Sequence, residues 1–132
     1  MNPTLTRLLA HATKDELDRV TPEELLAPDA VVSRDDARLV QAALYLKHGY
    51  LDACHKIAQQ IATPTGSYWH GMLHRREGDI SNSHYWYDRV GHHPVLEAIG
   101  GYPQDAATEE REFELLLAHT ISRATSPSRG TA

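Results

Sequence analysis

The sequence predicts an all-α fold of about six helices, and three observations support this prediction. Apolar residues recur at helical spacing, as Leu39, Ala42 and Leu46 do within one segment. Capping patterns precede several such segments, and glycine or proline follows them. No segment shows the sustained alternation of β-branched residues that is typical of strands. We expect one helical domain over residues 1–125 and a polar, disordered tail over 126–132.

The first expected helices are marked by their N-terminal caps. Thr13 and Thr21 are each followed three residues later by glutamate, a pattern that predicts capping boxes and two short helices. A longer helix is expected between an N-cap at Ser33 and a glycine stop at Gly49. The next helix is expected over residues 50–62.

The second half of the chain continues the helical pattern. Gly78 and Gly91 end two of the expected helices, and Ser81 is the expected N-cap of the second. The last helix carries acidic residues in its first turn, as the helix dipole favours. The expected segments cover residues 67–77, 82–90, a short turn within 92–99, and 108–124.

Two central segments resemble each other at an offset of 29 residues, Leu44–Ile57 and Leu73–Trp86. Gly49 falls on Gly78 in this alignment, and apolar positions coincide on both sides of the glycines. Each copy reads as a helix, a glycine stop and a second helix. The pattern predicts two tetratricopeptide-like or Sel1-like helical hairpins, with the flanking helices as caps.

Composition narrows the classes of partner and the cellular location. The net charge of −5, with histidines neutral, argues against a nucleic-acid partner, which requires a basic surface. No apolar run is long enough for a membrane span, and residues 1–12 do not read as a signal peptide. The single cysteine, Cys54, excludes an internal disulfide and favours a reducing, cytoplasmic location.

The nine histidines concentrate near the centre of the chain and suggest a metal site. On a helix, His70, His74 and Glu77 lie within an arc of about 60°, and two histidines at i and i+4 can bind one metal ion. Imidazole with carboxylate suits a divalent zinc, iron or nickel ion. A further ligand would come from elsewhere, and the candidates are His84, Asp79, His92 and His93. The alternative is that these histidines are ordinary polar or capping residues.

A second interpretation is a pocket for a small anionic molecule. Arg75 and Arg89 would hold the anion, since guanidinium binds carboxylate or phosphate through two hydrogen bonds, and Asn82 shares a helical face with Arg89. Asp79 and His93 would orient the metal ligands. The alternative is that the arginines pair with nearby acids and brace the hairpin.

The run from Ser67 to Val95 carries a dense motif, "YWHGMLHRREGDISNSHYWYDRVGHHP". It resembles a family of small, uncharacterised bacterial and fungal proteins with the signature YWHG-x-x-HRREGD-x-x-NA-x-YW-x-RR-x-G-x-HP. Ser83 replaces the alanine of the signature, and Asp88 replaces a basic residue. The matching positions are Trp69, His70, His74, Arg75, Arg76, Glu77, Gly78, Asp79, Asn82, Tyr85, Trp86, Arg89, Gly91, His93 and Pro94. The resemblance implies that this surface is important, and it implies no particular activity.

Two hypotheses follow from the sequence. In the first, a His/Glu/Arg pocket on the central hairpin binds a divalent metal or a small anion. In the second, the chain is a non-catalytic helical-repeat module that binds a protein partner. The reaction, the substrate and the oligomeric state stay open.

Overall fold

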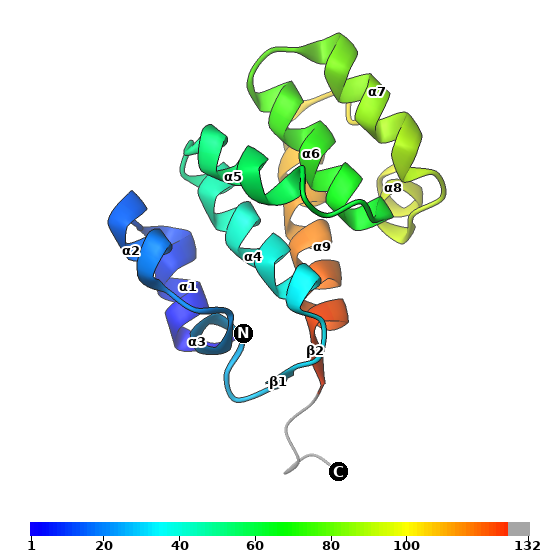
Figure 1. The fold of residues 1–132 in the computed structure, drawn as a ribbon. Coiled ribbons are helices and arrows are strands. Elements are labelled where there is room, and N and C mark those ends of the chain that lie inside the picture. Colours follow the sequence, from blue (N-terminus) through cyan, green and yellow to red (C-terminus); the bar gives the residue numbers. More distant parts are fainter. Residues whose placement is uncertain (127–132) are drawn as a thin grey trace.

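The computed structural model describes residues 1–126, and these residues are all-α apart from one small antiparallel ladder (Figure 1). The described residues form nine helices. The first, Pro3–Ala10, lies outside the segments expected from the sequence, and the total exceeds about six because the short expected segments are separate helices. The helices are α1 (Pro3–Ala10), α2 (Lys14–Arg19), α3 (Pro22–Leu26), α4 (Arg34–Lys47), α5 (Leu51–Ala58), α6 (Pro64–Arg76), α7 (Ile80–Val90), α8 (Pro94–Ile99) and α9 (Ala106–Ala124). The strands are β1 (Ala30–Val31) and β2 (Thr125–Ser126).

The chain just before α4 and the chain just after α9 meet in the β1–β2 ladder, which the sequence did not predict. Ala30 lies opposite Ser126 and Val31 opposite Thr125. Strands of two residues are too short to show an alternating pattern in the sequence. They lie side by side because α4 packs against α9. Ser126 was expected to begin the tail and instead pairs in β2. The rest of the expected tail, residues 127–132, lies outside the described residues.

The helix caps explain where most helices begin. The capping boxes at Thr13 and Thr21 are both present, as predicted. Thr63, expected to close the preceding helix, instead accepts a backbone hydrogen bond as the N-cap of α6, so α6 begins earlier than predicted. Asp79, rather than Ser81, is the N-cap of α7.

The two helical hairpins expected from the internal repeat are present as α4–α5 and α6–α7. Gly49 and Gly78, which the alignment matched, have φ angles of +83° and +84°. This left-handed conformation ends a helix and turns the chain, and glycine adopts it without strain. The two turns are therefore equivalent in backbone conformation.

Helix α4 lies at the centre of the molecule and provides much of its core. Leu39, Val40 and Leu44 are fully buried. Helices α5, α6 and α9 pack against α4, while α1 to α3 lie on the side of α4 that faces away from α7 and α8 (Figure 1). None of the helices within residues 1–126 is long and apolar enough to cross a membrane.

Helices α6 and α7 approach closely because of Gly71. A Cβ atom at this position would lie 2.6 Å from the Tyr87 ring, closer than packed atoms allow. The Ser83 hydroxyl donates a hydrogen bond of 2.8 Å to the Gly71 carbonyl, which fixes the register of the two helices. This close contact places the polar face of α7 beside the histidines of α6.

Candidate metal site

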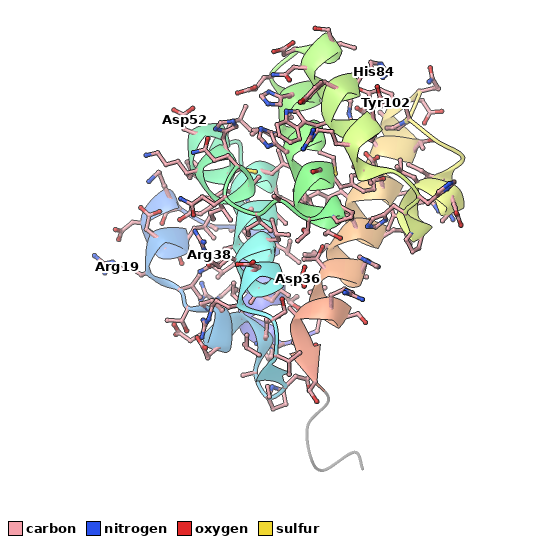
Figure 2. The ribbon with its side chains drawn as sticks, turned by 45° about the vertical axis from the view of Figure 1, so that its right-hand side comes forward. Arg19, Asp36, Arg38, Asp52, His84 and Tyr102 are labelled. Carbon is pink, nitrogen blue, oxygen red and sulfur yellow. The ribbon has the colours of Figure 1, made fainter. Side chains whose placement is uncertain are left out.

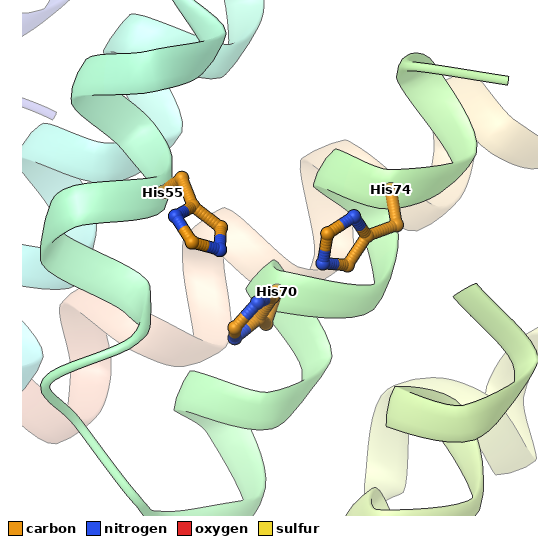
Figure 3. A group of neighbouring side chains, drawn as sticks. All are labelled: His55, His70 and His74. Carbon is orange, nitrogen blue, oxygen red and sulfur yellow. The ribbon is translucent and has the colours of Figure 1, made fainter. Parts of the chain in front are cut away.

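Three histidines from two helices converge between α5 and α6 (Figure 3). His55 comes from α5, and His70 and His74 come from successive turns of α6. Each offers a ring nitrogen, and the three nitrogens lie within 4.8 Å of one another. The i, i+4 spacing predicted that two of these rings would share a face. The packing of α5 on α6 supplies the third.

His70 is the most buried ring of the three, with 4% of its surface exposed. It stacks on the indole of Trp86 at a centroid distance of 3.8 Å and meets His55 edge-on at 4.8 Å. Its Nδ1 is the one buried side-chain nitrogen or oxygen in residues 1–126 that has no hydrogen-bond partner. An unpaired polar atom at such depth costs about 1–3 kcal/mol, so a ligand that engages it gains that energy back.

The electrostatics of the cluster keep His70 neutral. Burial, reinforced by the neighbouring His74 and His55, lowers the pKa of His70 to about 4. At neutral pH the ring therefore offers a lone pair rather than a second N–H group. Neutral imidazole is the form of histidine that binds metal ions.

His74 is oriented by two neighbours. Its Nδ1 lies 2.8 Å from Oε1 of Glu77, and because a carboxylate only accepts, Nδ1 is the donor. The Nε2 atom then carries the lone pair, and it lies 3.4 Å from the Asn82 side-chain amide. A carboxylate on the far nitrogen of a histidine is the usual outer contact of a metal-binding imidazole, and it fixes the tautomer and the ring orientation.

The spacing of the cluster fits a transition-metal ion after small side-chain rotations. Zn²⁺ binds imidazole nitrogen at about 2.0–2.1 Å, so two ligand nitrogens on a tetrahedral ion lie roughly 3.3 Å apart. The nitrogens here need to close from distances of up to 4.8 Å. His55 is only partly buried. Three protein ligands leave the fourth position of a tetrahedral ion open.

The other predicted residues of this pocket lie around the cluster. Glu77 contacts the far side of His74 rather than joining the three nitrogens. Asn82 faces the Nε2 atom of His74. Arg89 is exposed, with its guanidinium 5.5 Å from the centre of the Trp86 ring that covers His70. The Asp79 side chain accepts the backbone hydrogen bond of Asn82 as the cap of α7, and the Asp79 backbone N–H donates to the His74 carbonyl at 2.9 Å.

Arg75 lies apart from the cluster. It points to another face of α6, where Glu109, Glu112 and Tyr87 contact its guanidinium. The sequence-based alternative of a bracing arginine describes these contacts, although the partners are distant in the chain rather than in the hairpin.

His93 is also placed apart, near the start of α6. It caps α8: the Val95 amide donates to Nδ1, so Nε2 carries the proton and faces Thr65 at 3.3 Å. The ring packs against Tyr68 and His119. Both of its nitrogens therefore have protein partners.

His55 is the ligand candidate that the sequence did not identify. Its neighbour Cys54 is buried, and burial together with the Glu77 carboxylate raises the pKa of this thiol to about 12, so it is protonated in the metal-free protein. At the 29-residue offset of the internal repeat His55 aligns with His84, and this alignment is a weak signal in the sequence for His55. His84 behaves differently, because it lies exposed on α7 and stacks on Tyr102 at 4.0 Å (Figure 2).

No family model, curated protein or solved structure matches this chain. The geometry of the three histidines is therefore the basis on which a function is assigned.

Proposed function

We propose that this protein binds one divalent transition-metal ion through His55, His70 and His74. Three convergent histidines, one with a buried nitrogen that lacks a hydrogen-bond partner, carry the proposal. Glu77 is a positioning residue, because it touches His74 and not the three converging nitrogens. This assignment changes the role that the sequence suggested for Glu77, from ligand to support.

Zinc is the preferred ion, followed by iron and nickel. All three accept imidazole ligands, and a set of three histidines without thiolate or carboxylate suits the borderline character of zinc best. When bound, zinc would polarise water or a small anion at its open position. Asn82 and Arg89 lie on the α7 side of the cluster and would contact such an anion, in line with the sequence-based anion pocket.

The two equivalent hairpins favour one other function. Helical-hairpin repeats often form surfaces for protein partners, and Gly49 and Gly78 turn their chains identically. In a non-catalytic interaction module of this kind, the histidines would only pack the hairpins together. Removal of the histidines would then change stability and leave metal content at background.

The direct experiment is metal analysis of the untagged protein. We expect wild-type protein, stripped with a chelator and titrated with Zn²⁺, to bind one ion per chain by calorimetry and by elemental mass spectrometry. His55→Ala, His70→Leu and His74→Ala each remove one ligand and should abolish stoichiometric binding. His84→Ala is the matched control, since His84 is exposed and outside the cluster.

The same variants separate a site from a structural brace. Leucine replaces the His70 ring with an apolar group and removes the unpaired nitrogen. The free energy of unfolding of the metal-free variant should therefore lie within about 1 kcal/mol of the wild-type value. The absence of binding by zinc, iron and nickel would refute the proposal. Retention of full binding by His55→Ala would refute the three-histidine site in particular.

A further inference from the structure

A cavity of about 430 Å³ lies on the opposite side of α6 from the histidine cluster. Met72 lines it and follows His70 by two positions, which is about 200° around the helix. This volume is in the range of small-molecule sites. The lining residues come from α4, α6 and α9: Leu46, Lys47, Met72, Arg75, Arg76, Glu109, Glu110, Phe113 and Glu114.

The floor of the cavity is apolar. Leu46 and Met72 are almost fully buried, with 3% and 5% of their surfaces exposed. Phe113 adds an aromatic ring that packs edge-on against Trp69. A compact aliphatic or aromatic group placed here would lose its contact with water.

The charges around the floor are segregated by helix. The basic residues Lys47 and Arg76 belong to α4 and α6, while the acidic residues Glu110 and Glu114 belong to α9. None of the ion pairs within residues 1–126 involves any of these four side chains. Arg76 reaches the Leu46 carbonyl, and the Lys47 ammonium lies 5.8 Å from the Phe113 ring centre.

The two other charged residues of the lining are already neutralised. The Arg75 guanidinium contacts Glu109 and Glu112 at 2.7 Å each. Arg75 and Glu109 are therefore already paired with each other and add no net charge to the lining. A ligand with a single charge would pair with the side chains of opposite charge on one side of the cavity. It would leave the charged side chains on the other side without a partner.

We propose that this cleft binds a small zwitterion with an apolar side chain, of the free amino-acid class. Its carboxylate faces Lys47 and Arg76, its ammonium faces Glu110 and Glu114, and its side chain covers Met72 and Phe113. Charge complementarity of both walls selects this ligand over a simple carboxylate or amine. The site is separate from the histidine cluster and does not depend on metal binding.

Calorimetry with three molecules of nearly equal shape tests the proposal: L-leucine, 4-methylpentanoate, which lacks the ammonium, and isopentylamine, which lacks the carboxylate. We expect leucine to bind, and each single-charge analogue to bind at least about tenfold more weakly, which corresponds to about 1.4 kcal/mol. L-phenylalanine and L-methionine extend the series to other apolar side chains. Metal-free protein is used throughout, so that failure of the metal site does not affect the result.

Paired variants identify the walls. Glu110→Gln/Glu114→Gln should weaken leucine binding about tenfold and leave 4-methylpentanoate unaffected or tighter, while Lys47→Gln/Arg76→Gln should weaken leucine and spare isopentylamine. All four side chains are exposed, so these variants are expected to fold. Glu97→Gln, at an exposed position in α8, is the control for a lost negative charge. The proposal is overturned if none of the three amino acids binds, if an analogue binds as tightly as leucine, or if the paired variants match the control.

Discussion

The histidine cluster and the network around Glu112 are two groups of buried polar side chains. They differ in whether every buried polar atom has a hydrogen-bond partner. Glu112 is fully buried, and both of its oxygens are occupied: Arg75 donates to one, and the hydroxyls of Tyr68 and Tyr87 donate to the other. His70 is nearly as buried, yet its Nδ1 has no partner within residues 1–126.

This difference separates a structural network from a candidate site. A buried carboxylate is tolerated only when it is paired and hydrogen-bonded, and Glu112 meets both conditions. Its charge also raises the pKa of Tyr68 and Tyr87 beyond the effect of their burial, so both remain hydroxyl donors. An incomplete set in an otherwise satisfied core indicates that an atom from outside the chain completes it.

The largest expected effect comes from breaking the complete network. Glu112→Gln removes the charge that compensates Arg75 inside the core, and we expect a loss of about 3–5 kcal/mol in the free energy of unfolding. Glu109→Gln, at the exposed end of the same arginine, should cost about 1 kcal/mol or less. Urea denaturation of both variants measures the two values. Equal losses would show that burial does not distinguish the two ion pairs.

The pH dependence of stability gives the next effect. Burial lowers the pKa of His93 to about 4, assisted by His119, and His70 has a similarly lowered pKa. From about pH 6.5 down to about 4 the unfolded chain binds protons that the folded state excludes, so the metal-free protein loses stability as the pH falls. The slope is up to about 1.4 kcal/mol per pH unit for each histidine.

His93→Asn tests this assignment, because asparagine keeps a cap acceptor for α8 but does not titrate. Unfolding curves between pH 7.5 and 4.5 in a chelator should show a shallower slope for the variant than for wild type. Identical slopes would contradict the assignment of this acid sensitivity to His93. With zinc bound, His70 no longer titrates freely, and the histidines that still contribute to the slope are His93 and His119, whose pKa is also lowered by burial.

The smallest expected effect concerns the support of His74. Glu77→Gln keeps a hydrogen-bond acceptor but removes the carboxylate charge, and we expect zinc affinity to fall about 10- to 100-fold with unchanged stoichiometry. Asp79→Asn is the matched control, since the Asp79 side chain caps α7 and only its backbone, which the substitution keeps, bonds to His74. If Asp79→Asn binds zinc more weakly than Glu77→Gln does, the assignment of Glu77 as the carboxylate that supports His74 is wrong.

The parts of this site that depend on neighbouring residues were predictable from the sequence. Helical periodicity places His70, His74 and Glu77 on one face, and their contacts confirm that they share it. The turns at Gly49 and Gly78 likewise follow from local conformation. The cap at Asp79 was accessible too, because aspartate precedes the α7 segment and receives the amide three residues later.

The parts that depend on tertiary packing were not predictable. His55 joins the cluster because α5 packs on α6, and no spacing rule in one chain expresses that contact. Arg75 was assigned to an anion because its main partner, Glu112, lies 37 residues away in α9. The sequence offered acidic residues near Arg75 as possible partners. The fold instead brings the buried Glu112 of α9 to Arg75.

The β1–β2 ladder has a consequence for the connectivity of the chain. By pairing Ala30 with Ser126 it closes the segment from α4 to α9 into a loop, and α1 to α3, which precede this loop in the chain, pack against α4. The entropy cost of closing a loop grows only slowly with its length, so a short ladder supported by helix packing is enough. The histidine cluster and the cleft both lie within this closed loop. The ladder therefore holds together the two ends of the segment that contains both sites, although these ends are far apart in the sequence.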